Sequence, residues 1–486
     1  SQLTGVESGV FNFVASGTLS NGQTVIVTSD GKVAGVSTSQ VTQSVGSLTS
    51  FNTSGETNYI SSDYDSSTGR LVIAYRDNGN SNYGTAIVGT VDVDNNSISF
   101  GTEVVFESAT TNWIAVTYDA NAEKVVISYQ DGGNSSYGTA IVGTVSGTSI
   151  SFGSPTVFES ATTDRIHSVY DSNAQKVVIF YQDRGNSNYG TAIVGTVSGT
   201  SISFGSATVF ESANTSEFSG AFDSSNNKVV IAYKDLGNSN YGTAVVGTVS
   251  DTSISFGTPV VFESANTEYT ATAFDSENNK IVIAYRDAGN SNKGTYIVGT
   301  VSGTSISFGT ADYFENANSD HIGLAYDANA KKFVIVYGDV GNSDAYTINN
   351  GTLSGTTVTW GTPELVTGST IYGQISSVVY ASDVKRITVA FRNHSNSFYG
   401  SAYVYRNSYV DTNLTAENYI GITAAAIADG ATGKINIATG INEGQTGLTT
   451  GQKYYVQNNG SLATSAGSPS VVAGTAISST KIIVKG

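Results

Sequence analysis

The sequence predicts an all-β fold: a seven-bladed β-propeller of four-stranded antiparallel blades, closed by an N-terminal strand and followed by a small C-terminal β domain. Three observations predict it. A segment of about 52 residues recurs through the chain, each copy contains four strand-like segments, and three of the four prolines fall at one point of the copy. Repeats near 50 residues with four strands each are typical of propeller blades.

The repeat is defined by the motif Tyr-x-Asp-x-Gly-Asn-Ser. Successive copies lie 54 residues apart once and 52 residues apart four times, and their aspartates are Asp77, Asp131, Asp183, Asp235, Asp287 and Asp339. A seventh, more divergent copy, "FRNHSNS", has Asn393 in place of the Asp. Such regular spacing indicates one structural unit repeated along the chain rather than several unrelated domains.

One copy, from Asn112 to Glu159, shows the expected strands in order. "WIAVTYD" is a first strand, "KVVISYQ" a second, "YGTAIVGTV" a third and "SISFGSPTVFE" a fourth, with turn-forming residues between them. A four-stranded sheet buries both faces only by stacking against its copies. Pro155, Pro259 and Pro363 lie in the fourth strand, which agrees with an exposed edge because proline cannot donate a ladder hydrogen bond.

The two ends of the chain complete the expected architecture. The seventh copy lacks a fourth strand, and "SVGSLTSF" near the N-terminus aligns with "SFGSPTVF" of a complete copy. We therefore expect residues 40–52 to complete the last blade and the propeller to span residues 37–410. Residues 1–36 are expected to hold a hairpin with an Asp-Gly turn. Residues 411–486 are expected to form a small β domain that contains a hairpin with an Asn-Gly turn.

Composition excludes several classes of function. The formal net charge is −17 and no basic stripe is present, so neither nucleic-acid binding nor attachment to anionic membranes is expected. No apolar run has the length of a membrane span. The chain has no Cys and three His, and it lacks a phosphate-binding loop and a dinucleotide fingerprint, so neither a metal site nor a cofactor is expected.

The two terminal segments resemble parts of known structural proteins. "ASGTLSNGQTVIVTSDGKV" and "INEGQTGLTTGQKYYVQNNGSLATSAGSPSVVAGTAISSTKIIVKG" resemble modules of tail fibres, spikes and capsid-attached fibres of tailed bacteriophages, marine ones in particular. The resemblance implies a virion protein at the surface of an extracellular particle, with other virion proteins as partners. It further implies a host-surface glycan or receptor as the ligand of the propeller, and it leaves open whether the chain forms a homo-oligomer. Because propellers host many functions, the fold alone does not decide between them.

The candidate ligand-binding residues lie where one copy ends and the next begins. The loop between the second and third strands is nearly uniform, as in "DRGNSNYG" and "DLGNSNYG", whereas the segment before each first strand varies. In a propeller both loops lie on one rim. A constant frame with one variable rim favours a binding surface, and unselected variation in solvent is the alternative. The predicted rim residues are Tyr59, Trp113, Arg165, His167, Phe218, Tyr269, His321 and Tyr372.

The recurring frame residues favour structural roles. The repeated Asp is typical of a turn stabilised by its own backbone, and calcium binding is the alternative, although calcium requires six to eight oxygen ligands. The Tyr two residues before each Asp is expected to pack between blades with its hydroxyl bonded to a partner. The Glu of each "FES" segment is expected to cap the rim or to pair with a Lys.

We therefore predict a non-enzymatic virion fibre, spike or adhesin protein that binds glycan or another envelope component through the variable rim. One alternative is a purely structural module that decorates a capsid or tail. The other is an enzyme that acts on host polysaccharide, which would need two carboxylates about 5 to 9.5 Å apart. Arg is sparse and the Ser-x-Asp-x-Gly-x-x-Trp box of propeller sialidases is absent, so no catalytic residue is predicted.

Overall fold

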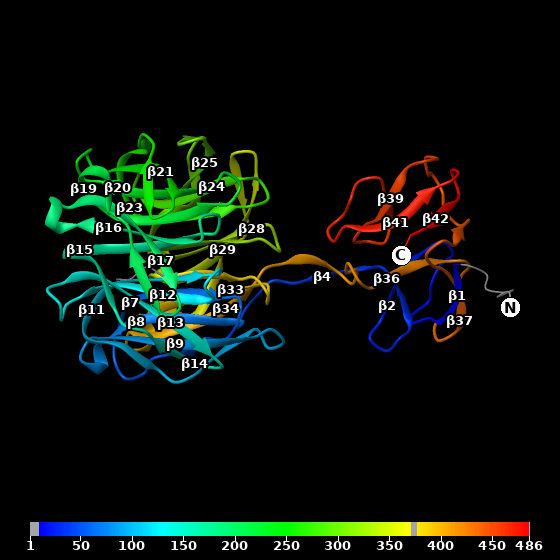
Figure 1. Cartoon of the computed structure of the whole chain (residues 1–486), viewed down its shortest axis with the longest axis horizontal. Helices are drawn as coiled ribbons and strands as arrows, with labels where there is room; N and C mark the ends of the chain where they lie inside the picture. Colours follow the sequence, from blue (N-terminus) through cyan, green and yellow to red (C-terminus); the bar gives the residue numbers. More distant parts are fainter. Residues whose placement is uncertain (1–8, 371–376, 486) are drawn as a thin grey trace. The chain divides into compact units, whose positions relative to one another are not determined.

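The computed structural model describes residues 9–370 and 377–485, which form β-strands and short 3-10 turns without an α-helix. The predicted all-β class is therefore confirmed for this part of the chain (Figure 1). It contains no helix with the length and apolar character needed to cross a membrane. Gln43–Asn407 form one unit that holds the repeats, and Ser1–Thr42 form a second unit together with Ser408–Gly486.

Each repeat forms an antiparallel sheet of four strands, as the sheet around β12 (Lys124–Asp131) illustrates. The second half of β11 (Val104–Asp119) is the inner strand and pairs with β12, which pairs with β13 (Tyr137–Ser146). β13 pairs in turn with β14 (Ser149–Phe152) and with the first half of β15 (Thr156–Asp171), which together form the outer strand. The same order recurs in the other repeats, so the unit has a β-propeller fold.

The remaining strands of this unit follow the same pattern in chain order. They are β5 (Ser44–Val45), β6 (Thr49–Ser50), β7 (Thr57–Asp65), β8 (Arg70–Asp77), β9 (Tyr83–Asp92), β10 (Ser97–Phe100), β16 (Lys176–Asp183), β17 (Tyr189–Ser198), β18 (Ser201–Phe204), β19 (Thr208–Asp223), β20 (Lys228–Asp235), β21 (Tyr241–Ser250), β22 (Ser253–Phe256), β23 (Val260–Asp275), β24 (Lys280–Asp287), β25 (Lys293–Ser302), β26 (Ser305–Phe308), β27 (Asp312–Asp327), β28 (Lys332–Asp339), β29 (Ala345–Ser354), β30 (Thr357–Trp360), β31 (Glu364–Thr370), β32 (Ser377–Ala381), β33 (Arg386–Asn393) and β34 (Tyr399–Arg406).

The outer strand differs from the predicted continuous strand. It is interrupted between β14 and β15, where the Gly153 N–H donates to the Val142 carbonyl at 2.9 Å and Pro155 needs no ladder partner. Its second part then continues directly into the inner strand of the next repeat, so that β15 spans 16 residues. The partner of β15 changes from β13 to β16 between Thr162 and Thr163, and a register shift between Asp164 and His167 follows within the second pairing. Strand propensity does not reveal where β15 passes from one repeat to the next, because the residues on both sides of that point form strands.

The N-terminal segment supplies the outer strand of the last repeat. β5 and β6 both pair with β34, which is the pairing that the sequence alignment predicts. Just after β6, Phe51 is 5% exposed, and its ring centroid lies 5.2 Å from that of Tyr75 and 5.7 Å from that of Phe100. Backbone pairing and aromatic packing therefore join the beginning of this unit to its end.

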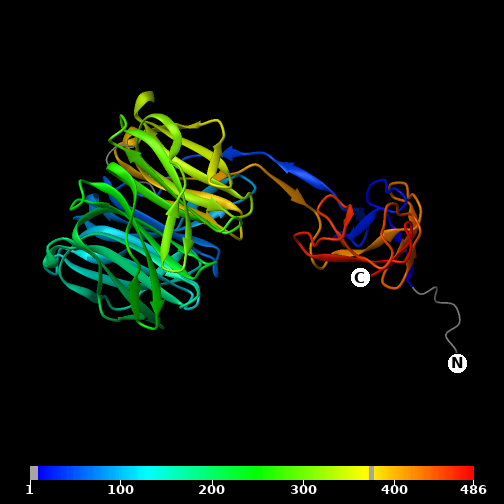
Figure 2. The same cartoon turned by 90° about the horizontal axis from the view of Figure 1, so that it is seen from above.

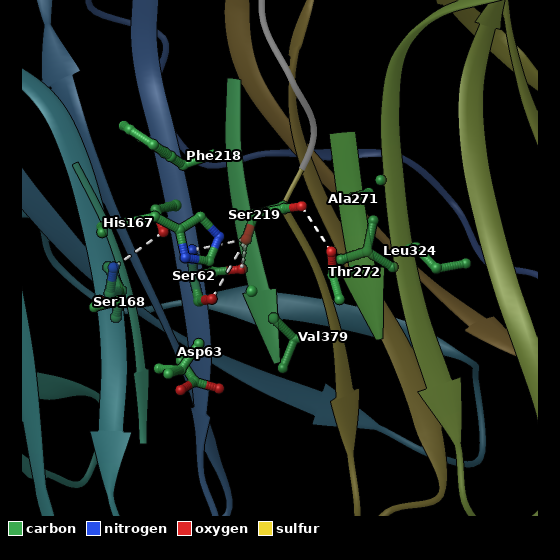
Figure 3. A pocket seen from close by; sticks show the side chains of 18 of the residues that line it. Ser62, Asp63, His167, Ser168, Phe218, Ser219, Ala271, Thr272, Leu324 and Val379 are labelled. Carbon is green, nitrogen blue, oxygen red and sulfur yellow. Dashed lines mark hydrogen bonds between the residues drawn. The ribbon is translucent and has the colours of Figure 1, made fainter. Parts of the chain in front are cut away.

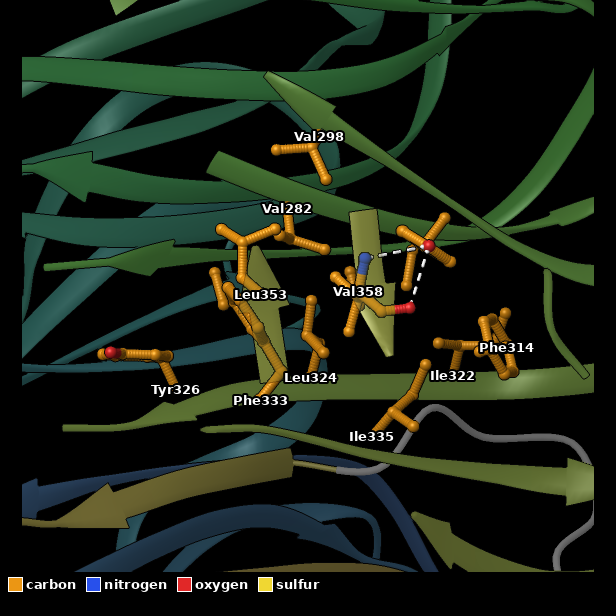
Figure 4. Close-up of a cluster of buried hydrophobic side chains, with 14 of the residues drawn as sticks. Val282, Val298, Phe314, Ile322, Leu324, Tyr326, Phe333, Ile335, Leu353 and Val358 are labelled. Atoms are coloured by element: carbon orange, nitrogen blue, oxygen red, sulfur yellow. Dashed lines mark hydrogen bonds between the residues drawn. The ribbon is translucent and has the colours of Figure 1, made fainter. Parts of the chain in front are cut away.

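Apolar residues of neighbouring sheets fill the space between them. In one such cluster, Val282 and Val298 of one sheet pack with Ile335 and Val358 of the next (Figure 4). The hydroxyl of Tyr296 donates to the carbonyl oxygen of Val358 at 3.1 Å and accepts from its N–H at 3.0 Å. Stacked sheets thus bury the apolar faces that a single sheet would expose.

A tyrosine–glutamate hydrogen bond recurs between neighbouring repeats. Tyr129 and Tyr181 are fully buried, and their hydroxyls donate to Glu107 at 3.1 Å and to Glu159 at 3.0 Å. The same bond joins Tyr233 to Glu211, Tyr285 to Glu263 and Tyr337 to Glu315. The predicted role of the tyrosines is confirmed. Each of these glutamates has a structural role as the acceptor of a tyrosine hydroxyl.

The second unit combines both ends of the chain in one sheet (Figure 2). β1 (Val10–Val14) pairs with β37 (Thr432–Asn436), and β2 (Thr24–Val27) pairs with β36 (Tyr419–Thr423) and with β3 (Val33–Gly35). The structure thus differs from the predicted separate segments 1–36 and 411–486. The physical reason is that each segment alone has too few apolar residues to bury, as the mixed cluster of Ile26, Val36, Ile422 and Val471 shows.

The remaining strands of this unit form a second sheet and a two-stranded ribbon. The sheet contains β38 (Ile441–Asn442), β39 (Lys453–Val456), β40 (Leu462–Ala463), β41 (Val471–Ala476) and β42 (Ile482–Val484). The predicted hairpins are present as β2–β3 and β39–β40. The ribbon pairs β4 (Thr38–Val41) with β35 (Tyr409–Thr412).

Candidate ligand-binding channel

The inner strands of the repeats surround a cavity of about 800 Å³. Its walls are formed by residues of β7, β11, β15, β19, β23, β27 and β32. Figure 3 shows side chains from several of these strands around it, including Asp63, His167, Ser219 and Thr272. Ligand sites commonly have volumes of about 300–1,000 Å³, so the cavity has the size of a small-molecule or short-oligomer site.

Six equivalent residues at the start of the inner strands line this cavity, and we call them the girdle. They are Tyr59, Trp113, Arg165, Glu217, Tyr269 and His321. Their φ angles lie between 50° and 54°, in the left-handed region. Such a backbone is costly for any residue other than glycine. Because it recurs with unrelated side chains, we infer that the fold imposes the bulge and leaves the side chain free to vary.

The girdle residues contact one another in sequence around the channel. The ring centroids of Tyr59 and Trp113 are 5.0 Å apart, and the guanidinium of Arg165 lies 4.9 Å from the Trp113 ring. Arg165 forms an ion pair with Glu217, with 2.7 Å between Nη1 and Oε1. Glu217 in turn accepts a hydrogen bond from the Tyr269 N–H at 3.3 Å. These contacts stabilise the positions of side chains that belong to successive repeats.

Two aromatic rings of the girdle, Tyr59 and Tyr269, each contact an arginine and a second ring. The guanidinium of Arg76 lies 4.8 Å from the centre of the Tyr59 ring, which also contacts the Trp113 ring. Tyr269 contacts both Arg286, at 5.4 Å, and His321, whose ring centroid is 4.8 Å away. These contacts hold the Tyr59 and Tyr269 rings in place at the girdle.

Side chains of the second strands link the rim from one repeat to the next. Gln130 Nε2 donates to Asp164 Oδ1 at 2.6 Å, and Lys234 lies 3.6 Å from Glu268. The last repeat is tied to the first in the same way, because Arg392 donates to Asn58 at 2.7 Å. This second set of contacts makes the support of the girdle continuous across the closure point.

The sequence predicts Phe218 as a ligand-binding residue, and the structure places both Phe218 and its neighbour Glu217 in the cavity wall. Phe218 is 8% exposed, and its ring packs against Phe180 and Phe210 at centroid distances of 6.2 and 6.0 Å. Glu217 occupies the equivalent girdle position. The repeat spacing indicates Glu217, because it follows Arg165 by the regular 52 residues.

His167 lies two residues beyond the girdle and also lines the cavity. Its ring stacks on Phe180 with centroids 5.1 Å apart, and its Nδ1 is buried without a hydrogen-bond partner among the described residues. Burial lowers the pKa of His167 to about 4, so its imidazole is neutral at neutral pH. The last predicted rim residue, Tyr372, lies outside the described residues.

Hydroxyl groups and one carboxylate line the channel beyond the girdle. Ser219 and Thr272 share a hydrogen bond of 2.7 Å, and Ser62 donates to Ser377 at 2.9 Å (Figure 3). Asp63 is half-buried and accepts hydrogen bonds from the Tyr64 and Tyr118 N–H groups at 2.8 and 2.7 Å. Burial raises the pKa of Asp63 to about 6, although both hydrogen bonds act in the opposite direction. Sequence reasoning did not identify this residue.

The repeated Asp residues stabilise turns, as predicted. Asp131 Oδ1 accepts hydrogen bonds from the Gly133 and Asn134 N–H groups at 2.8 and 3.1 Å, and Asp77 accepts from the Gly79 N–H at 2.9 Å. Among residues 9–370 and 377–485, no three or more His, Cys, Asp or Glu side chains are grouped as a metal site would require.

Comparison with known proteins shows similarity of fold at low sequence identity. No protein-family model matches the chain, and no curated protein sequence matches it significantly. A lectin of Burkholderia pseudomallei, BP39L, is 11% identical, with a TM-score of 0.49 over 71% of this chain and 95% of the lectin. The Cps50 (Swd1) β-propeller domain of Myceliophteria thermophila is 6% identical, with a TM-score of 0.48 over 74% of this chain and 99% of the domain. At these values the similarity carries no argument about a ligand.

Proposed function

We propose that this protein is a non-enzymatic binding module and that a host-surface glycan binds in the central channel of a seven-bladed propeller. The observation that carries the proposal is the girdle. Five residue types occupy six equivalent backbone positions around one cavity, within a frame that is otherwise copied almost unchanged. Variation confined to the wall of a cavity is expected of a recognition surface, whereas variation in solvent would not gather there.

The chemistry of the channel wall suits a hydroxyl-rich ligand. Arg165 and Glu217 neutralise each other, and serine and threonine hydroxyls continue along the channel. Hydroxyl groups donate and accept hydrogen bonds, as do the groups of a sugar ring. Polar groups that fix orientation within a partly apolar cavity are common in small-ligand sites.

The blade count and the location of the protein belong to the same proposal. The seventh copy of the repeat, its sheet of β32, β33 and β34, and the outer strand supplied by β5 and β6 support seven blades. The resemblance of the terminal segments to phage fibre modules supports a role at the surface of a virion. In that role the second unit would hold the protein to other virion proteins.

A glycan array probed with the full chain tests the proposal. We expect binding to a limited set of glycans, and we expect Trp113→Ala to weaken it at least tenfold. Tyr313→Ala is the matched control, because Tyr313 is an aromatic residue 38% exposed on the outer strand β27 and does not line the cavity. Absence of binding to any glycan, or equal binding by both variants, would contradict a glycan site in the channel.

A further inference from the structure

Asp63 is the exceptional residue at its position in the repeats. The pairing of the inner strands with the second strands places it in register with Thr117, Val169, Ala221, Ala273, Ala325 and Val379. All of these are small, aliphatic or a threonine, so the frame does not require a carboxylate there. Withdrawing a carboxylate from water costs several kcal/mol unless it is compensated. A carboxylate at this one position is therefore unexplained by packing.

The charge of Asp63 is not neutralised within the channel. Three charged side chains line the described cavity wall, and two of them, Arg165 and Glu217, form an ion pair with each other. Asp63 bonds to two backbone N–H groups, and no Lys, Arg or His forms an ion pair with it among the described residues. The charged group that acts on it is Asp65 of its own strand, which is also negative.

The described residues of the strands on either side of Asp63, β11 and β32, present no positive charge to it. β11 contributes the Tyr118 N–H, and β32 contributes Ser377 and Val379 to the same cavity. Two residues before Asp63, Ser61 faces the same cavity, and its hydroxyl accepts a hydrogen bond from the Val116 N–H at 3.0 Å. Among the residues that the structure describes, Asp63 is thus the one charged group of the channel wall without an oppositely charged partner, and it lies beside neutral hydroxyl groups.

We propose that the channel ligand carries a protonated primary amine, as an amino sugar with a free amine does, and that this ammonium group binds the Asp63 carboxylate. This inference rests on the proposed binding function of the channel and names the chemistry of its ligand. The ammonium supplies the positive charge that the protein does not, and the hydroxyls of the sugar meet those of Ser61 and Ser377. Charge-assisted hydrogen bonds of this kind are roughly twice as strong as neutral ones.

The test compares glucosamine with N-acetylglucosamine by isothermal titration calorimetry on the full chain at pH 7. The two sugars share a ring, and acetylation removes the positive charge. We expect glucosamine to bind at least tenfold more tightly, and we expect Asp63→Asn to abolish this preference. Asp251→Asn is the control, since it removes the same charge from an exposed turn outside the cavity. Because burial raises the pKa of Asp63 to about 6, the preference should weaken between pH 7 and pH 5.

A second variant separates binding from folding. Asp63→Val installs the residue that the equivalent positions 169 and 379 already carry, so it should fold and also lose the preference. Equal affinity for both sugars in the unmodified chain, a preference that survives both Asp63 variants, or no binding of either sugar would overturn the inference. If neutral glycans still bind and Trp113→Ala weakens that binding, the channel proposal stands and the assignment of an amine ligand falls.

Discussion

The guanidinium of Arg165 lies 2.7 Å from the carboxylate of Glu217, which belongs to the next repeat. The side chain of Glu217 is 16% exposed and also accepts the Tyr269 N–H. We expect a double-mutant cycle of Arg165→Ala and Glu217→Ala to give a coupling of about 1 kcal/mol in urea unfolding, the upper range for partly exposed pairs. Strictly additive effects of the two changes would show that the pair does not stabilise the girdle.

The left-handed backbone of the girdle predicts that glycine is more stable than alanine there, in contrast to an ordinary strand position. Arg165 has a φ of 54°, so Arg165→Gly should be more stable than Arg165→Ala by about 1 kcal/mol in chemical denaturation. Val105 is 41% exposed in the strand β11 and does not have a left-handed φ. There, Val105→Gly should be less stable than Val105→Ala. The same order at both positions would contradict the bulge geometry.

The buried tyrosine–glutamate bond predicts a loss of stability on removal of a single oxygen atom. Tyr181→Phe leaves the Glu159 carboxylate without the hydroxyl that donates to it at 3.0 Å. We expect a cost of about 2 kcal/mol in the free energy of unfolding, which is typical of a hydrogen bond to a charged group. Tyr313→Phe on the exposed outer strand serves as the control and should cost much less. Equal costs would mean that the buried bond contributes little.

The same glutamates predict how stability depends on pH. Burial raises the pKa of Glu107, Glu159, Glu211 and Glu263 above its ordinary value. The folded chain therefore binds these protons more tightly than the unfolded chain does. Protonation of the glutamates stabilises the fold fully below the ordinary Glu pKa, and this stabilisation is lost as the pH rises through the raised pKa values. We expect the free energy of unfolding to fall from pH 4.5 towards neutrality.

A glutamine variant identifies the source of this pH dependence. Replacing all four glutamates by Gln keeps an oxygen that accepts the tyrosine hydroxyl and removes the titration. The decline between pH 4.5 and neutrality should then become shallower when thermal or urea unfolding is followed at each pH. A decline of unchanged slope would assign the effect to other groups.

The closure of the repeat unit depends on Phe51 and the two short strands before it. Phe51→Ala should lower the free energy of unfolding by about 3 kcal/mol, because it opens a cavity among Tyr75 and Phe100. Val105→Ala on an exposed strand position is the control, with an expected effect below about 0.5 kcal/mol. If both variants unfold at the same urea concentration, the N-terminal segment does not close the unit.

Particular residues show how far the sequence could predict the site. Tyr59, Trp113, Arg165, Tyr269 and His321 were found because they vary at a constant spacing, and all of them line the channel. Phe218 also lines the channel, whereas Glu217, which has the left-handed girdle backbone, is not predicted because sequence alone does not show the register of a bulge. Asp63 was missed because its significance depends on which face of the strand reaches the cavity. A comparison of the copies position by position would have shown a charged residue among aliphatic ones.

The sequence by itself determined the repeat, the order of strands within it and the N-terminal origin of the last outer strand. These features are local: spacing, turn residues and alternating apolar residues recur within each copy. The tertiary structure decided which side chains face the channel, which tyrosine meets which glutamate and how the two ends of the chain share a sheet. Those outcomes depend on contacts between residues distant in sequence, and a shift of one residue along a strand reverses the face that a side chain occupies.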